Sequence, residues 1–258
     1  MDRTPARAAA HSARAGQDTG RVHSWDLSTG VDGPGTRFVL FTSGCPLRCL
    51  YCQNPDTWRR RDGRPMTVDE VMEKVGNCRT FLTASGGGVT VSGGEPLLQP
   101  AFTGEILRRC KDAGLHTALD TSGNLGDRAD SALLAATDLV LLDIKSVDSA
   151  THRGLTGGDL APTLRFARRL DGLGVPVRVR YVLVPGWTDG EADVDALAAF
   201  VSGLSVVERV DVLPFHKLGA AKYEALGIPF PLRDTPTPSR ELVERVRGQF
   251  GAHGVRAD

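Results

Sequence analysis

The sequence predicts an α/β protein built around a mainly parallel sheet. Strand-length apolar segments alternate with helix-like segments along most of the 258 residues, and this alternation is typical of βα units joined by right-handed crossovers. The apolar segments are continuous runs, such as DLVLLDIK at 138–145, and continuous runs indicate strands buried on both faces. About six such units can form an open barrel, a closed barrel or a doubly wound sheet, and periodicity does not choose among these.

The predicted elements follow one another in a regular order. TRFVLFTSG at 36–44 has the apolar run of a strand, and VDEVMEKVGNC at 68–78 has the pattern of a helix. RDTPTPSR at 233–240 is a proline-rich loop before a last helix. The remaining elements are a strand at 88–94, a helix near 100–113, a strand at 115–120, a helix near 128–136, and strands at 138–145, 175–186 and 207–216, the last two each followed by a helix-like segment.

Composition excludes several classes of protein. With 31 basic and 31 acidic side chains the formal charge is zero, which argues against a nucleic-acid platform. No apolar run approaches the roughly 18–20 residues that span a bilayer. Residues 1–20 contain arginines but no apolar core of a secretory signal, so we expect a disordered, solvated tail there, with an organellar transit peptide as the rival interpretation. No linker divides the rest, so we expect one domain over 21–258 in a cytoplasmic protein.

Three of the five cysteines lie together in GCPLRCLYC, at Cys45, Cys49 and Cys52. Thiolates suit zinc or iron–sulfur centres, but a structural zinc site or a ferredoxin-type cluster uses four ligands. The other two, Cys78 and Cys110, fall on predicted helices well away in sequence. Three thiolates on a cubane cluster leave one iron open to a substrate, so the trio predicts an incomplete, catalytic site. A zinc or iron–sulfur module for structure or electron transfer remains the non-enzymatic alternative.

Polar residues gather where the predicted strands end, in the segments SGGE, LDTSG, LDIK and LPFH. The carboxyl ends of parallel strands form the edge at which α/β proteins bind ligands. Paired glycines at 93–94 allow the backbone to approach a ligand closely, although a simple turn would also use them. Asp143 and Lys145 could form a structural pair, or Asp143 and Asp120 could hold a hard cation through carboxylate oxygens.

The cysteine spacing C-x3-C-x2-C, with Tyr51 just before the last cysteine, resembles the radical SAM superfamily. Longer segments resemble the pyruvate formate-lyase activating enzymes in the same order: VDGPGTRFVLFTSGCPLRCLYCQNPDTW, ASGGGVTVSGGEPLLQ, HTALDTSG, DLVLLDIK, VRYVLVPGWTD and LPFHKLG. They cover most of residues 21–250. The resemblance implies an incomplete (β/α)6 TIM-like barrel and a [4Fe–4S] cluster with three cysteine ligands and one open iron.

The resemblance also implies a reaction. S-adenosylmethionine binds the open iron and is cleaved by an electron from the cluster. The resulting 5′-deoxyadenosyl radical removes hydrogen from a backbone glycine of pyruvate formate-lyase. A flavodoxin or ferredoxin is the implied electron donor. An activase for a different glycyl radical enzyme, or a radical SAM enzyme acting on a small molecule, is the alternative.

Site residues are carried over by resemblance onto matching positions. The cluster ligands and catalytic cysteines are Cys45, Cys49 and Cys52; the cofactor contacts are Tyr51, Cys52, Gln53, Asn54, Gly93, Gly94, Glu95, Asp143, Ile144, Lys145 and His216; a monovalent or similar cation would be held by Asp120, Thr121 and Asp143; and the partner's peptide would be gripped by Asp32 and Arg180.

The chain departs from the family at one site position. The better-known members carry histidine directly after the third cysteine, whereas this chain has Gln53. A planar amide can lie against adenine, but it lacks the stacking ring and any proton role. The chain also lacks a ferredoxin-type cysteine insertion after the cluster loop, which favours pyruvate formate-lyase as the partner over other glycyl radical enzymes.

Overall fold

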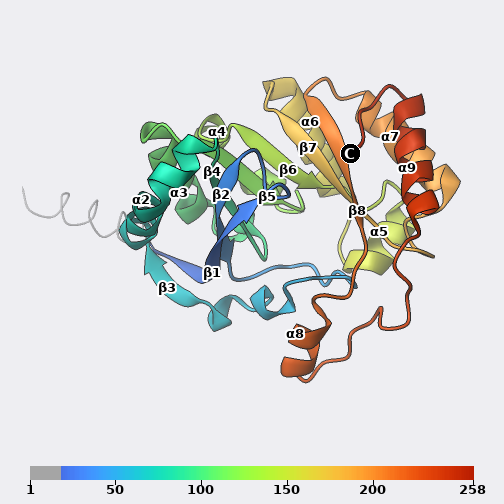
Figure 1. The fold of residues 1–258 in the computed structure, drawn as a ribbon, viewed down its shortest axis with the longest axis horizontal. Coiled ribbons are helices and arrows are strands. Elements are labelled where there is room, and N and C mark those ends of the chain that lie inside the picture. The colour runs from blue at the N-terminus through green and yellow to red at the C-terminus, as the bar shows by residue number, and fades with distance from the viewer. Residues whose placement is uncertain (1–18) are drawn as a thin grey trace, which may run out of the picture.

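The computed structural model describes residues 19–258. Six parallel strands form one side of a single sheet whose order is β3-β1-β2-β4-β5-β6-β7-β8 (Figure 1). The two edges of this order, β3 and β8, are not paired with each other, so the sheet is an open barrel. The parallel strands are β2 (Thr36–Thr42), β4 (Gly88–Gly93), β5 (His116–Thr121), β6 (Leu139–Asp143), β7 (Val177–Leu183) and β8 (Val207–Pro214). The predicted incomplete (β/α)6 barrel is therefore confirmed.

Two strands extend the sheet beyond the predicted units. β1 (Thr19–Thr29) pairs antiparallel with β2, and β3 (Arg64–Thr67) pairs antiparallel with β1. The sequence analysis did not predict either strand. β1 begins inside the range 1–20 that was expected to be a tail; the rest of that range, residues 1–18, lies outside the described residues.

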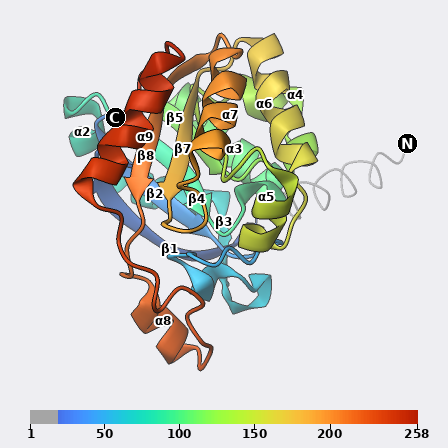
Figure 2. The same cartoon turned by 90° about the vertical axis from the view of Figure 1, so that its right-hand side faces the viewer.

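Helices cover the outer face of the curved sheet, and α8 projects from the end that carries the cysteine loop (Figures 1 and 2). Thr67 and Glu70 form a reciprocal capping box that starts α2 at Val68. The helices are α2 (Val68–Ala84), α3 (Pro100–Asp112), α4 (Ser131–Ala135), α5 (Ser149–Thr156), α6 (Ala161–Leu173), α7 (Glu191–Ser202), α8 (Ala220–Ala225) and α9 (Arg240–Ala252).

The side chains of each strand alternate between two environments. On β6, Val140 and Leu142 belong to the large core between sheet and helices, whereas Leu139, Leu141 and Asp143 lie on the opposite face of the strand. The inner face becomes polar toward the carboxyl ends, where the expected ligand edge lies. Among residues 19–258, no helix is long and apolar enough to cross a membrane.

Candidate active site

A cavity of about 190 Å³ lies at the carboxyl ends of the parallel strands, between them and the cysteine loop. Most residues expected at the site line this cavity together. They are Cys45, Cys49, Tyr51, Cys52, Gln53, Asn54, Gly93, Gly94, Asp120, Thr121, Asp143, Lys145 and Arg180. Further lining residues that the sequence did not single out are Leu47, Trp58, Ser92, Ser122, Val182 and Leu213.

The cysteine loop is fixed by backbone hydrogen bonds on both sides. The Gly44 amide donates to the Thr57 carbonyl at 2.7 Å, which closes the loop on itself. The Arg48 amide donates to the Thr156 carbonyl at 2.8 Å, which fastens the loop to the end of α5. A Cβ on Gly94 would lie 2.4 Å from the Gly44 carbonyl oxygen, so only glycine lets the end of β4 come this close. These contacts fix the position of the loop against β4 and α5.

The three thiols are free, and burial dominates their chemistry. Burial raises the pKa of Cys49 to about 11 and raises the pKa of Cys45 and of Cys52 as well. Thiols in this environment stay protonated near neutral pH unless a metal holds them as thiolates. Within residues 19–258, no three histidine, cysteine or acidic side chains converge on one metal ion. A cubane does not require that convergence, because each cysteine binds a different iron.

Buried polar atoms beside the trio also fit an iron–sulfur cluster. The hydroxyl of Tyr51 has no hydrogen-bond partner among the described residues, although Tyr51 is only 5% exposed. A buried donor without a partner is costly unless an absent ligand accepts its hydrogen. The free thiols and this unpartnered donor together are compatible with a sulfur-rich group held in the loop.

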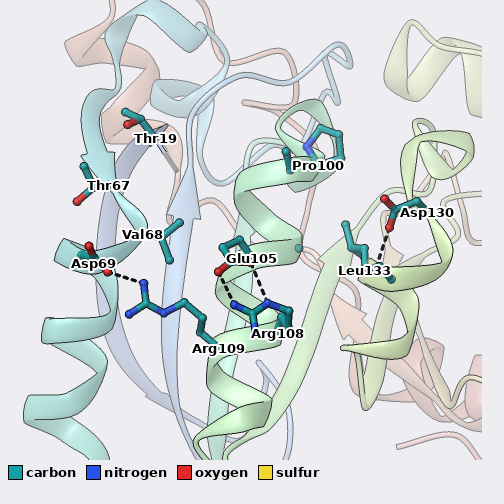
Figure 3. Close-up of a pocket in the computed structure, with 13 residues that line it drawn as sticks. Thr19, Thr67, Val68, Asp69, Pro100, Glu105, Arg108, Arg109, Asp130 and Leu133 are labelled. Carbon is teal, nitrogen blue, oxygen red and sulfur yellow. Dashed lines mark hydrogen bonds and ion pairs between the residues drawn. The ribbon is translucent and has the colours of Figure 1, made fainter. Parts of the chain in front are cut away.

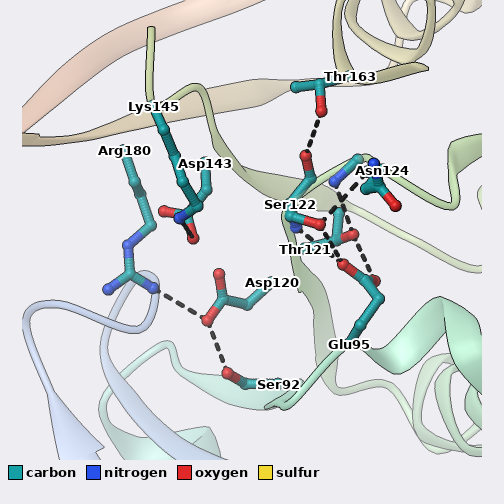
Figure 4. Close-up of polar contacts among 11 residues, drawn as sticks. Ser92, Glu95, Asp120, Thr121, Ser122, Asn124, Asp143, Lys145, Thr163 and Arg180 are labelled. Carbon is teal, nitrogen blue, oxygen red and sulfur yellow. Dashed lines mark hydrogen bonds and ion pairs between the residues drawn. The ribbon is translucent and has the colours of Figure 1, made fainter. Parts of the chain in front are cut away.

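Two ion pairs set the charge of the inner wall (Figure 4). Arg180 Nη1 lies 3.0 Å from Asp120 Oδ2, which also accepts from Ser92 Oγ at 2.6 Å. Asp120 raises the pKa of Arg180 above its usual range, while burial raises the pKa of Asp120. Lys145 Nζ lies 3.0 Å from Asp143 Oδ2 and 5.4 Å from the centre of the Tyr51 ring.

Lys145 keeps its charge in spite of its burial. Burial alone would lower the pKa of Lys145, but Asp143, then Tyr51 and Cys49, raise it well above its usual value. The site therefore presents an ammonium group at the strand ends, and such a group suits a carboxylate ligand.

Glu95 lies behind the cavity wall and organises it (Figure 4). Its Oε1 accepts from Thr121 Oγ1 at 2.6 Å, and its Oε2 accepts from both the amide and the hydroxyl of Ser122 at 3.0 and 2.6 Å. The expected cation ligands Asp120, Thr121 and Asp143 are thus all engaged with protein groups.

Gln53 joins the cysteine loop to the segment after β8. Its Nε2 donates to the Tyr51 carbonyl at 3.2 Å and to the His216 carbonyl at 3.1 Å. The neighbouring Asn54 Oδ1 accepts from Lys222 Nζ on α8 at 2.8 Å. His216 itself is exposed and does not line the cavity.

The other expected residues take different places. Ile144 is fully buried in the main core and does not line the cavity. Asp32 lies in a glycine-rich loop whose Gly30, Gly33 and Gly35 all have positive φ. Its backbone carbonyl accepts from Thr90 Oγ1 at 2.6 Å, so the loop folds against β4, and its charge helps to raise the pKa of Arg180.

Sequence reasoning missed the serines of the site. Ser92 lies within the segment SGGE and contacts Asp120, but only its glycines and Glu95 were taken as site residues. Ser122 lies within LDTSG and contacts Glu95. Their position at the carboxyl ends of predicted strands is the feature of the sequence that could have identified them as site residues.

A second, more voluminous cavity of about 920 Å³ lies elsewhere, on the outer surface between α2, α3 and the start of α4 (Figure 3). Its charged residues are paired with one another: Arg109 with Asp69 at 2.5 Å, and Arg108 with Glu105 at 2.6 Å. Asp130 caps α4 through the Leu133 amide at 2.8 Å. This groove brings together no nucleophile, thiol or buried charge, so the chemistry belongs to the smaller cavity.

Comparison with known proteins agrees with this geometry. The family model described as the radical SAM superfamily matches residues 39–198. The chain is 43% identical over 237 residues to the pyruvate formate-lyase 1-activating enzyme of Escherichia coli (strain K12), which covers 91% of this chain and 96% of that protein. It is 45% identical over 232 residues to the pyruvate formate-lyase-activating enzyme of Staphylococcus aureus (strain USA300), which covers 87% of this chain and 92% of that protein.

A solved structure extends the likeness to the fold. The crystal structure of a domain of pyruvate-formate lyase-activating enzyme from Bacteroides vulgatus matches with a TM-score of 0.57 at 29% identity, over 67% of this chain and 98% of that chain. The superfamily match spans the cysteine loop and strands β4 to β7, which are the elements that build the cavity. The chain therefore belongs to the radical SAM superfamily and, within it, to the family of the pyruvate formate-lyase activating enzymes.

Proposed function

We propose that this protein activates pyruvate formate-lyase by generating a glycyl radical on it. The observation that carries the proposal is the loop of three free cysteines, fixed at the mouth of a polar cavity, in a chain similar over nearly its whole length to proteins named for that activation. Radical SAM enzymes use a [4Fe–4S] cluster with S-adenosylmethionine, and in our proposal Cys45, Cys49 and Cys52 are the three ligands of that cluster. When bound, the cluster supplies the electron that cleaves S-adenosylmethionine and starts hydrogen abstraction.

The residues of the chain position the reactants. The Lys145 ammonium, held by Asp143 at 3.0 Å, would attract the carboxylate of the cofactor. The backbone at Gly93 and Gly94 would approach its methionine end closely. The apolar residues Leu47, Val182 and Leu213 line the same cavity and would keep water away from a reactive carbon.

Arg180 and Asp32 are the proposed grip on the partner's peptide. Arg180 pairs with Asp120 at the cavity, and Asp32 lies close enough for its charge to help raise the pKa of Arg180. A glycine suits this site because it can thread a narrow mouth without a side chain, and its target carbon must come within about 3–3.5 Å of the attacking carbon. In this proposal a flavodoxin or ferredoxin supplies the electron, a monovalent cation at Asp120, Thr121 and Asp143 assists the cofactor, and the protein works in the cytoplasm.

The proposal is tested by anaerobic reconstitution with iron and sulfide. The reduced protein should give the electron paramagnetic resonance signal of a four-iron cluster, and added S-adenosylmethionine should change that signal. Incubation with pyruvate formate-lyase should then yield a glycyl radical signal, whereas other glycyl radical enzymes should yield none. A signal on a different partner alone would assign the activity to that partner instead.

Cysteine variants supply the matched control. Cys49→Ala should abolish both the cluster and cleavage of S-adenosylmethionine. Cys78→Ala should leave both intact, because Cys78 lies on α2 and packs against the main core. Equal loss from both variants would contradict a three-cysteine site.

A further inference from the structure

The three tyrosines of the chain differ in how their hydroxyl groups are satisfied. Tyr181 donates to the Thr188 carbonyl and is buried on the outer face of β7. Tyr51 and Tyr223 have hydroxyls without any partner among residues 19–258, although they are only 5% and 1% exposed. Both unpartnered hydroxyls belong to the small hydrophobic cluster that packs against Cys49 and Cys52. The unsatisfied donors are therefore concentrated beside the thiols.

Tyr223 reaches this position because α8 is fastened to the cysteine loop. Lys222 Nζ lies 2.8 Å from Asn54 Oδ1 and 3.1 Å from Asp56 Oδ2. The Tyr223 ring packs edge-on against Trp58, with ring centres 5.8 Å apart. These contacts hold a short helix against a loop more than 160 positions away in the sequence.

Packing shows which groups surround Tyr223. Its ring belongs to the small hydrophobic cluster against which the side chains of Cys49 and Cys52 pack. The Cys52 amide lies close as well, but it already donates to the Cys49 carbonyl at 3.1 Å. An amide is a donor in any case, so the hydrogen of the phenol still lacks an acceptor. Sulfur at Cys52 and Cys49 is the acceptor chemistry present on that side.

We propose that the Tyr223 hydroxyl donates a hydrogen bond to a sulfur of the cluster on its Cys52 side and thereby raises the reduction potential of that cluster. This inference rests on the proposed function, because it requires the cluster in the cysteine loop. Hydrogen bonds to cluster sulfurs are one of the means by which a protein sets such potentials, since they stabilise the more negative reduced state. Tyr223 is a positioning and tuning residue rather than a catalytic one.

Gly219 fixes the distance between α8 and the loop. A Cβ at this position would lie 3.0 Å from both Cα and Oε1 of Gln53 and 3.1 Å from the Cys52 carbonyl oxygen. Its φ of −73° is helical, so alanine is permitted by the backbone and would act only by pushing α8 away from the loop. Gly219→Ala should therefore weaken the same hydrogen bond without removing the hydroxyl.

The test is a redox titration of the reconstituted protein without S-adenosylmethionine. In Tyr223→Phe, the ratio of reduced to oxidised cluster at a fixed potential should fall about tenfold, a shift of about 59 mV to more negative potential for a one-electron couple. Gly219→Ala should shift the potential in the same direction by less. Tyr181→Phe, the matched loss of a buried hydroxyl away from the cysteines, should leave the potential unchanged.

A second measurement uses the cluster-free protein. Tyr181→Phe should lower its melting temperature because a satisfied hydrogen bond is lost, whereas Tyr223→Phe should leave it unchanged or raise it because an unpartnered hydroxyl is removed. An unchanged potential in Tyr223→Phe, or a melting temperature lowered as in Tyr181→Phe, would overturn the inference. Failure of the proposed function has a different signature: wild-type protein with an intact cluster would form no glycyl radical on pyruvate formate-lyase.

Discussion

At the scale of single residues, Glu95 shows how a buried carboxylate can order a site without facing it. It is fully buried, and its two oxygens accept four hydrogen bonds: one from the Leu97 amide, one from Thr121 and two from Ser122. Burial raises the pKa of Glu95, and the four donors act against that rise. The carboxylate thus ties the end of β4 to the end of β5, from which Asp120 and Thr121 reach the cavity.

Glu95→Gln should destabilise the protein although it changes only one atom. The amide NH2 would face the donors of Ser122, so at least one buried donor would lose its acceptor, which costs on the order of 1–3 kcal/mol. Chemical denaturation of the cluster-free protein measures this loss. Glu73→Gln on the exposed side of α2 is the control and should change stability little. Equal stability of the two variants would show that the four contacts contribute nothing.

At the scale of elements, α5 carries the cysteine loop. Its last carbonyls, at Leu155 and Thr156, accept from Leu50 and Arg48 at 2.9 and 2.8 Å. In its middle, His152 is only 1% exposed, and neither ring nitrogen has a partner among the described residues. Burial, then the charge of Lys145, lowers the pKa of His152 to about 4, against the opposing charge of Asp159. Burial at this position therefore favours the neutral form of His152.

Acid should loosen α5 selectively. Between pH 6.5 and about 4 the unfolded chain binds a proton at His152 that the folded chain does not bind. The free energy of unfolding that depends on neutral His152 is therefore fully present above pH 6.5 and is lost as the pH falls toward about 4. His152→Phe should remove that slope, and at pH 5 wild type should have lost on the order of 1–2 kcal/mol relative to the variant, after discounting for solvent screening. Urea unfolding across pH 4–7 measures both.

Buried and partly exposed elements differ in how well the sequence predicts them. The parallel strands β2, β4, β5 and β6 were predictable because they are buried along nearly their whole length, as in β6, whereas β7 and β8 alternate apolar with polar residues in the period of a strand. β1 was not predictable, because only its first four residues alternate between exposed and buried, the rest contain no buried residue, and its partner β3 is a strand of only four residues. Strand-end residues such as Asp120 and Asp143 were predictable, since the carboxyl ends of parallel strands share one edge. The contact of Lys222 with Asn54 was not, because no local pattern specifies a pair so far apart in sequence.

At the scale of the whole molecule, most of the buried apolar side chains among residues 19–258 belong to two hydrophobic clusters of unequal size. The large one fills the space between the sheet and the helices from β1 to α9 and includes residues such as Phe38, Leu119 and Phe250. The small one surrounds the cysteine loop and includes Tyr51, Phe215, Tyr223 and Phe230, together with the partly buried Cys49 and Cys52. A group bound by the three cysteines should therefore stabilise the small hydrophobic cluster and have little effect on the packing of the large one.

Removing the iron–sulfur cluster from the reconstituted protein should accordingly loosen the region around the cysteine loop and leave the sheet unchanged. Amide hydrogen exchange under anaerobic conditions should rise in residues 44–58 and 216–230, because the small hydrophobic cluster then loses the group that its cysteines bind. Amides of β4, β5 and β6 should remain protected, because their outward side chains belong to the large core, whose packing does not involve the cysteines. Exchange that rises throughout the sheet on cluster removal would show that the core depends on the cluster. Exchange that is unchanged in 216–230 would show that α8 is held by its protein contacts alone.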